Sequence, residues 1–419
     1  MLNSSHFSSG GEVMDVTREL VFSTYGTLVC ATLVLLLGRK LVEWIAPLRT
    51  YSIPEPVAAG LLVALGTLAM RQFGHFELRF DTSLQGPLML AFFATIGLSA
   101  NLASLRAGGK RLVLFVGVVA GMLIMQNVIG VGLAVSMGLA PGIGLLGGSI
   151  TLAGGHGTGA AWGETLTTRY GVQSALEIAM ACATFGLVMG GLLGGPVARY
   201  LVGRRLGGKV PGREATKDAA PEGFEQPHTV RLITAQALIE TVAMIAICLL
   251  GGELIAAGLS DTPFELPTFV CVLFTGVLVR NLLSLVRYEV FDRSLSVLGN
   301  VSLSLFLAMA LMALRLWDLS TLAVPMIVIL VTQAVAMAAY AIFVTFRVMG
   351  GNYDAAVLAA GHCGFGLGAT PTAIANMQAV TERFGPSHLA FLIVPMVGAF
   401  FIDILNALVI KGFLSLPLF

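Results

Sequence analysis

The stretch SITLAGGHGTGAAWG, residues 149–163, sets a glycine-flanked histidine in otherwise apolar sequence, and VLAAGHCGFGLGATPTAIANM, residues 357–377, repeats the pattern late in the chain. Each glycine costs a helix about 1 kcal/mol relative to alanine. In a bilayer, backbone released from a helix is tolerated only where protein or a water-filled cavity surrounds it. Two such breaks, placed alike in the two halves of a chain, indicate the substrate site of a secondary transporter.

The composition is that of a polytopic membrane protein. Of 419 residues, 56% are hydrophobic and 11% are charged, whereas a soluble chain carries roughly 25% charge. A net charge of +1 leaves no basic face for a nucleic-acid partner. The five cysteines are scattered through apolar segments without a metal-binding spacing, and they imply no disulfides. The polar N-terminal extension contains Glu12 and Asp15, unlike a basic signal peptide, so the first apolar segment is expected to be retained.

Ten apolar runs are long enough for a hydrocarbon core of about 30 Å, which takes roughly 20 helical residues. They lie near residues 23–42, 56–72, 87–104, 112–138, 177–201, 230–258, 266–284, 295–316, 321–346 and 387–414. The expected fold is an all-α polytopic membrane protein whose ten transmembrane helices form two inverted five-helix repeats, each with a re-entrant hairpin. The expected segments are a polar extension at 1–22, a first repeat at 23–202 with its hairpin at about 145–163, a cytoplasmic linker at 203–228, and a second repeat at 229–419 with its hairpin at about 353–377.

Internal sequence similarity supports the repeat. LAGGHGTG (152–159) aligns with LAAGHCGF (358–365). Two looser pairs are LAFFATIGL (90–98) with LFLAMALMA (305–313), and ATFGLVMGGLLGGPV (183–197) with PMVGAFFIDILNALV (395–409). The looser pairs alone do not exclude chance. An odd number of spans in each unit forces the second copy to insert in the opposite direction, which makes the repeat inverted.

The distribution of basic residues predicts the orientation. Cytoplasmic loops carry an excess of Lys and Arg. With both termini periplasmic, most of the 24 basic residues fall on the cytoplasmic side. These are Arg39, Lys40, Arg49, Arg106, Lys110, Arg111, Arg199, Arg204, Arg205, Lys209, Arg213, Lys217, Arg231, Arg280, Arg287, Arg293, Arg347 and Arg383.

The residues at the breaks suit an anion and a small cation. Helix ends at mid-membrane present free N–H groups and a positive dipole end, which favour a carboxylate. Hydroxyl and amide groups beside freed carbonyls offer neutral oxygen ligands for Na⁺, and Pro371 marks the restart of a helix. The alternative is that the glycines only permit close helix packing. The candidate substrate-binding residues are Ser149, Thr151, Gly155, His156, Gly157, Thr158, Gly159, His362, Gly364, Gly366, Thr370, Thr372 and Asn376.

A single intramembrane acid is the main candidate for cation binding. Asp403 lies in the apolar run FIDILNAL, and acids inside membrane segments are functional by default. It is assigned to binding either the cation or a substrate ammonium group. Asn406 shares its helix face, and Gln126 with Asn127 forms a second polar pair that interhelical hydrogen bonding explains equally well. The candidate sodium ligands are therefore Asp403, Asn406, Gln126 and Asn127, with Asp403 as the one metal-binding acid.

Enzyme motifs are missing from the sequence. GTGAAW (157–162) lacks the third glycine of a dinucleotide fingerprint at its expected place, and no GxxxxGK[ST], HExxH or GxSxG motif occurs. The chain is not expected to be an enzyme or to carry a cofactor. Na⁺ is expected only as a coupling ion.

At these residues the chain resembles the glutamate:sodium symporter family. The resemblance is carried by GGHGTGAAW, ATFGLVMGGLLGGP, GHCGFGLGATPTAIANM and FLIVPMVGAFFIDILNALVIK, together with PEPVAAGLLVAL (54–65), GPLMLAFF (86–93) and NVSLSLFLAMAL (300–311). It covers nearly the whole chain from Tyr25 onward. It implies a homodimer in the bacterial inner membrane, the glycine motifs at re-entrant loops, and inward transport of L-glutamate driven by a sodium gradient through an elevator-like movement. It does not assign a role to Asp403.

Three other functions stay open on the residues alone. A sodium/proton antiporter also uses broken helices and intramembrane acids, a passive channel would conduct without accumulation, and a membrane enzyme would need motifs that the sequence lacks.

Overall fold

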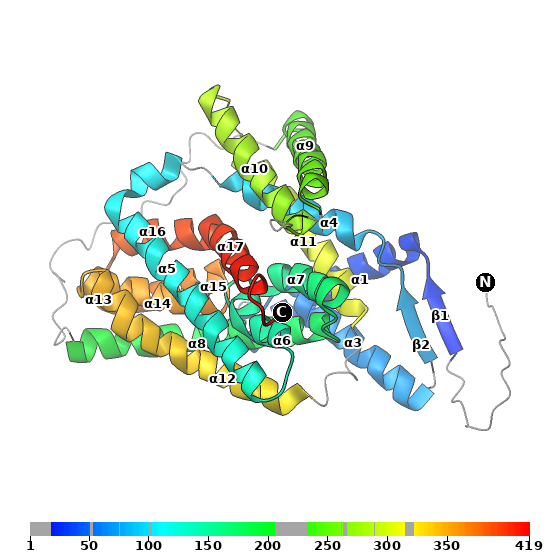
Figure 1. Cartoon of the computed structure of the whole chain (residues 1–419), viewed down its shortest axis with the longest axis horizontal. Coiled ribbons are helices and arrows are strands. Elements are labelled where there is room, and N and C mark those ends of the chain that lie inside the picture. The colour runs from blue at the N-terminus through cyan, green and yellow to red at the C-terminus, as the bar shows by residue number, and fades with distance from the viewer. Residues whose placement is uncertain are drawn as a thin grey trace.

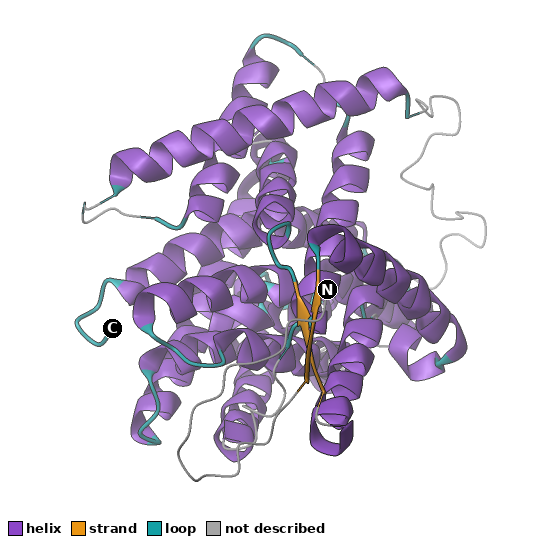
Figure 2. Cartoon of the chain, turned by 90° about the vertical axis from the view of Figure 1, so that its right-hand side faces the viewer, coloured by secondary structure: helices purple, strands orange, loops and turns teal. Residues whose placement is uncertain are grey.

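The computed structural model describes residues 18–50, 53–74, 76–100, 103–205, 233–260, 262, 266–288, 290–314 and 322–419. Most of the expected N-terminal extension (1–17) and of the expected linker (206–228) lies outside the described residues. Helices dominate the described part, and a single pair of strands lies beside them (Figure 2).

The described helices occupy all ten apolar runs. In the first half they are α1 (Thr24–Trp44), α2 (Ala46–Thr50), α3 (Glu55–Gly74), α4 (Gln85–Ser99), α5 (Ala103–Ser136), α6 (Pro141–Leu145), the π-helical η1 (Leu146–Ile150), α7 (Gly155–Tyr170), α8 (Ala175–Tyr200) and η2 (Leu201–Arg205). In the second half they are α9 (Ala235–Leu259), α10 (Thr268–Leu285), α11 (Asp292–Met312), α12 (Ala323–Tyr340), η4 (Ala341–Thr345), α13 (Phe346–Val348), α14 (Tyr353–Leu367), α15 (Thr370–Phe384), α16 (His388–Met396), η5 (Val397–Phe401) and α17 (Ile402–Leu414).

Within the described residues, 8 helices are long and apolar enough to cross a membrane. They are Thr24–Trp44, Glu55–Phe73, Gly109–Ser136, Ala175–Arg204, Ala235–Leu259, Thr268–Leu285, Asp292–Met312 and Ala323–Val348. α4 is apolar but shorter. The chain is therefore a predominantly helical, multi-pass membrane protein.

A two-stranded parallel sheet is the feature that the sequence did not predict. β1 (Arg18–Phe22) pairs with β2 (Phe76–Phe80), and the rings of Phe22 and Phe80 stack with centroids 5.1 Å apart. β1 leads into α1 and β2 follows α3, and these helices pack together, so their adjoining ends bring the strands side by side. Beyond β2, the Thr24 hydroxyl donates to the Asp81 carboxylate, which holds the pKa of Asp81 below its usual value.

The helices pack into two groups, each built from both halves of the chain. The first group contains α1, α3, α4, α9, α10 and α11; the second contains α5–α8, α12 and α14–α17. In Figure 1, α9 and α10 lie at the top and α1 and α3 on the right, whereas α5, α8, α12 and α14 lie on the left. Within the first group, α4 and α10 approach closely at glycine: a Cβ on Gly97 would lie 2.1 Å from the Leu273 carbonyl oxygen. Small residues allow such approaches between membrane helices.

Both glycine clusters interrupt helices. The first break, residues 153–154, follows the helical residues after η1 and precedes α7. Gly148 (φ −109°, ψ −138°) and Gly155 (φ +69°) lie outside helical geometry on either side of it. The second break, residues 368–369, separates α14 from α15, and Pro371 lies in the first turn of α15 as expected. The two helix–break–helix units span residues 141–170 and 353–384, longer than the expected 145–163 and 353–377.

The two histidines do not occupy equivalent places, although the letter match paired them. His156 lies in the first turn of α7, directly after the first break, whereas His362 lies inside α14, ahead of the second break. The matched letters therefore stand at different distances from the breaks. The physical reason is that a helix can break at any of several glycines in such a cluster, and the surrounding packing selects which one.

Glycines on α8 bring the two breaks together. A Cβ on Gly186 would lie 2.2 Å from the Leu367 carbonyl oxygen and 2.8 Å from Leu152 Cδ2, so this glycine sits between the residues that adjoin the two breaks. A Cβ on Gly155 would in turn lie 3.7 Å from the Gly368 carbonyl oxygen. The two breaks are thus neighbours in space, although more than 200 residues separate them in the sequence.

Candidate functional site

A cavity of about 470 Å³ lies where the two helix groups meet, and both breaks line it. The second group contributes Ala153, Gly154, Gly155, His156, Gly157, Leu187, Phe365, Gly368, Ala369, Thr370, Pro371, Gly398, Ile402 and Asp403. The first group contributes Pro54, Glu55, Pro56, Phe92, Ile96, Asn300, Leu303, Ser304 and Leu307. A volume of this size lies within the range of small-molecule sites.

Two helix N-termini reach this cavity without side-chain caps. α7 begins after Gly154 and α15 begins after Ala369, and neither capping residue supplies a side-chain hydrogen bond to the first turn. The first N–H groups of a helix have no intrahelical acceptor. Because the positive end of the helix dipole adds to these donors, each N-terminus is suited to a carboxylate.

Asp403 brings a carboxylate to the same cavity from α17. It lies in the first turn of α17, beside Ile402, which also lines the cavity. Among the described residues, no three His, Cys, Asp or Glu side chains gather as a metal cluster. The donor set at the cavity consists of two carboxylates, from Asp403 and Glu55, the imidazole of His156 and neutral oxygens. A set made mostly of oxygens suits Na⁺ better than a transition metal.

Five of the predicted substrate- and sodium-binding residues line the cavity. They are Gly155, His156, Gly157, Thr370 and Asp403. His156 Nε2 lies 3.1 Å from the Thr184 hydroxyl on α8, and the Thr370 hydroxyl donates to the Gly398 carbonyl. These contacts fix the first turns of α7 and α15 against neighbouring helices.

The other predicted site residues do not line the cavity: Ser149, Thr151, Thr158, Gly159, His362, Gly364, Gly366, Thr372, Asn376, Gln126, Asn127 and Asn406. Thr151 donates to the Leu146 carbonyl at 2.6 Å, and Asn376 donates to the Gly190 carbonyl on α8 at 2.8 Å. His362 Nδ1 lies 2.9 Å from the Thr345 hydroxyl, and its ring packs among aromatic rings. These side chains hold the arms of the helix–break–helix units in place.

Close packing, the alternative stated above, accounts for two of the glycines. A Cβ on Gly364 would lie 2.4 Å from Ala373 Cα, in the opposite arm of the same unit, and a Cβ on Gly366 would lie 2.7 Å from Met122 Sδ. Both distances are too short for any larger residue without movement of a neighbour. Gly159 is also tight, since its Cβ would lie 3.1 Å from Thr151 Cγ2.

Polar residues of the first helix group were missed by the sequence reasoning. Asn300 and Ser304 on α11 and Glu55 at the start of α3 line the cavity. Asn300 and Ser304 are four residues apart in an apolar run, so they share one helix face, and that spacing was the available signal. What the spacing could not show is that this face meets the two breaks.

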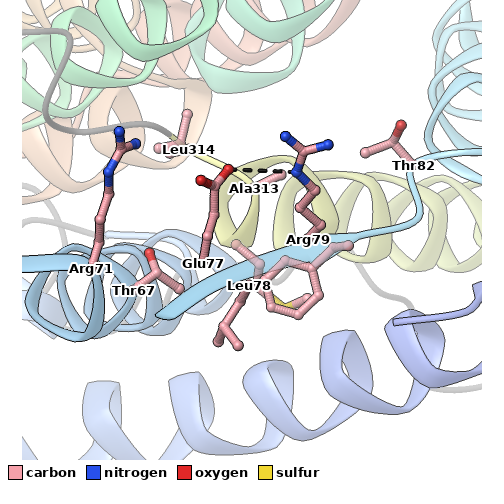
Figure 3. Close-up of a pocket in the computed structure, with 10 residues that line it drawn as sticks. Thr67, Arg71, Glu77, Leu78, Arg79, Thr82, Ala313 and Leu314 are labelled. Carbon is pink, nitrogen blue, oxygen red and sulfur yellow. Dashed lines mark ion pairs between the residues drawn. The ribbon is translucent and has the colours of Figure 1, made fainter. Parts of the chain in front are cut away.

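A second pocket, of about 230 Å³, lies beside β2 and is shown in Figure 3. Its lining includes Arg71, Glu77, Arg79 and Thr82, with Glu77 and Arg79 paired at 3.5 Å. It contains neither break nor any residue singled out from the sequence. The cavity at the breaks is therefore the candidate functional site.

The model of the family described as "Sodium/glutamate symporter" matches residues 20–386. The chain belongs to the sodium/glutamate symporter family. It is 65% identical to the sodium/glutamate symporter of Escherichia coli (strain K12) over 397 residues, covering 94% of this chain and 98% of that protein. It is 56% identical to the sodium/glutamate symporter of Haemophilus influenzae over 391 residues, covering 93% and 96%. The family resemblance is confirmed, and this member of the symporter family is a transporter and not an enzyme.

Proposed function

We propose that the chain carries out sodium-coupled uptake of L-glutamate across the bacterial inner membrane by alternating access. Membership of the sodium/glutamate symporter family supports the substrate and the coupling ion. The structural observation that carries the proposal is the shared cavity: two uncapped helix N-termini and Asp403 meet in it, at the boundary between two helix groups.

Glutamate binds with its carboxylates at the N-termini of α7 and α15. Their free N–H groups and dipole ends compensate negative charge, and Thr370, Asn300 and Ser304 add neutral hydrogen-bonding groups. The two N-termini come from opposite halves of the chain but line the same cavity. One ligand with two carboxylates can therefore engage both.

Na⁺ binds at Asp403 together with carbonyl oxygens released at the breaks. Its positive charge offsets the charge that glutamate brings into a site of low dielectric constant. Since both ligands share one cavity, each strengthens the binding of the other, as linkage requires. Bound Na⁺ thereby lowers the net negative charge of the occupied site, which favours its passage across the membrane.

The second helix group moves relative to the first in an elevator-like step. The cavity lies on the boundary of the groups, so relative movement would expose it to alternate sides. Two further spans, α4 and the continuous α16–η5–α17 segment, bring the number of transmembrane helices to ten. They form two inverted repeats with re-entrant hairpins at the breaks. The chain is a homodimer with both termini periplasmic and the central linker cytoplasmic.

Labelled-glutamate uptake by the purified chain in proteoliposomes tests the proposal. An inward sodium gradient should drive accumulation of glutamate above its external concentration, and an equal potassium gradient should not. Sodium-driven proton flux without dependence on an amino acid would favour an antiporter. Conductance without accumulation would favour a channel. Either of these results would overturn the proposed function.

A further inference from the structure

Five fully buried polar side chains form a cluster behind the cavity. Gln126 and Asn127 lie on α5, Ser149 on η1, Gln333 on α12 and Asn406 on α17, and each is 0% exposed. This set is called the α5–η1 polar cluster. It draws on four elements that are distant in sequence, and it contains no charged residue.

Hydrogen bonds to backbone groups fix the orientation of these side chains. Asn127 Oδ1 accepts from the Ser149 N–H at 2.9 Å, and Asn406 Nδ2 donates to the Ser149 carbonyl at 2.9 Å. Gln126 Nε2 donates to the Gly366 carbonyl at 2.7 Å, and Gln333 Nε2 donates to the Gln126 carbonyl at 2.6 Å. Every amide that donates in this network leaves its own side-chain oxygen available.

Four oxygens of the cluster accept no hydrogen bond from the described part of the chain. They are Gln126 Oε1, Ser149 Oγ, Gln333 Oε1 and Asn406 Oδ1. Buried acceptors without a partner are unfavourable, and native structures contain few of them. Four such oxygens in two neighbouring sets of hydrogen-bonded side chains favour a bound group that offers positive charge or donors.

We infer that the α5–η1 polar cluster binds one Na⁺ ion, separate from the ion at Asp403. Neutral amide and hydroxyl oxygens suit a hard monovalent cation, whereas protein sites for Ca²⁺ or Mg²⁺ use carboxylates, which this cluster lacks. Buried water is the competing occupant. Water would also serve Asn127 Nδ2, the cluster nitrogen without an acceptor among the described residues.

The position of the cluster explains how this ion acts on the substrate site. Gln126 holds the arm before the second break through Gly366, and Asn127 and Asn406 hold the arm before the first break through Ser149. None of the five cluster residues lines the cavity. A cation bound here orders both arms from behind and raises the affinity for glutamate. This coupling role rests on the proposed function.

Ser149→Ala tests the site with the smallest change to the network. Both hydrogen bonds of Ser149 in the cluster use its backbone, so alanine removes only the hydroxyl, which has no partner in the described part of the chain. The assay is thermal unfolding of the purified protein without glutamate, titrated with NaCl while choline chloride keeps the ionic strength constant. Loss of one oxygen ligand should raise the half-saturating sodium concentration by about tenfold or more.

Ser294→Ala is the matched control. Ser294 on α11 also has a fully buried hydroxyl with no partner among the described residues. Because it lies outside the cluster, its variant should keep the wild-type sodium midpoint. All sodium titrations are repeated with proteins that also carry Asp403→Asn. This substitution removes the Asp403 carboxylate as a source of stabilisation by sodium. The cluster predicts that sodium still stabilises this variant.

Gln333→Met serves as a second variant if Ser149→Ala does not fold. It removes another of the four oxygens, together with the donor to the Gln126 carbonyl, and should shift the midpoint in the same direction. Wild-type midpoints in the folded cluster variants, or no sodium response in the Asp403→Asn protein, would overturn the inference in favour of buried water. Glutamate uptake by the wild type is scored separately. Its failure would defeat the proposed function, and the sodium titration would still decide the cluster site.

Discussion

Replacing Gly186 by alanine should separate the two breaks and strongly reduce transport. The added Cβ would lie 2.2 Å from the Leu367 carbonyl oxygen and 2.8 Å from Leu152 Cδ2. An ordinary contact needs about 3.4 Å or more, so the Leu367 carbonyl must withdraw by about 1 Å. Overpacking of this kind costs about 1–3 kcal/mol of stability. A displacement of about 1 Å at a site that positions its ligand can cost about a hundredfold in rate.

The assay is the initial rate of sodium-driven glutamate uptake into proteoliposomes, normalised to folded protein by size-exclusion chromatography. Gly195→Ala, on the same helix, is the control, because nothing lies within 4 Å of its added Cβ. That change favours the helix by up to about 1 kcal/mol, so uptake should stay within about twofold of the wild type. Full uptake by folded Gly186→Ala would refute the claim that close contact between the breaks is required.

Three further predictions concern the cavity and its supports. Asp403→Asn should raise the half-saturating sodium concentration for uptake at least tenfold. The reason is that opposite charges about 4 Å apart attract by about 4 kcal/mol before desolvation at an effective dielectric constant near 20. Unchanged sodium affinity in the purified variant would contradict the assignment of Asp403 as a sodium ligand. Thr370→Val should lower uptake by loss of the bond to the Gly398 carbonyl, and Thr370→Ser should restore it, whereas equal rates for both variants would contradict a role for that hydroxyl. Asn376→Ala should lower the free energy of unfolding by about 1–2 kcal/mol, because the Asn376 amide donates to the Gly190 carbonyl and so holds α15 against α8. The sodium concentration at half-maximal stabilisation should stay that of the wild type. A changed sodium midpoint would instead place Asn376 at a cation site.

The helices and the existence of both breaks could be predicted because their signals are local. Apolar runs of sufficient length and glycine density act within one stretch of chain. The exact position of each break depends on tertiary packing and could not be predicted from the local sequence. In the cluster around His362, for example, the helix continues to Leu367 because Gly364 and Gly366 pack tightly against Ala373 and Met122. The internal sequence similarity therefore aligned two histidines that are not equivalent in the structure: His156 follows its break, whereas His362 precedes its break.

The candidate site was predictable on one side of the cavity only. Asp403, Thr370 and the residues at 155–157 stand out as polar or helix-breaking within apolar sequence, and all of them line the cavity. Asn300 and Ser304 belong to the other helix group, and their role depends on which face of α11 meets the breaks. That choice is made by packing between groups, such as the tight approach of Gly157 to Phe92 and Leu303. The two-stranded sheet could not be predicted for the same reason: it depends on tertiary packing. The five residues RELVF form a strand only because β2 lies beside them.

A structure of the protein determined by cryo-electron microscopy in sodium chloride and L-glutamate tests the central claim most directly. We expect glutamate density between the start of α7 and the start of α15, with its carboxylates at the N–H groups after residues 154 and 369 and an ion beside Asp403. Glutamate bound elsewhere, with the cavity between the two helix groups empty, would contradict the account.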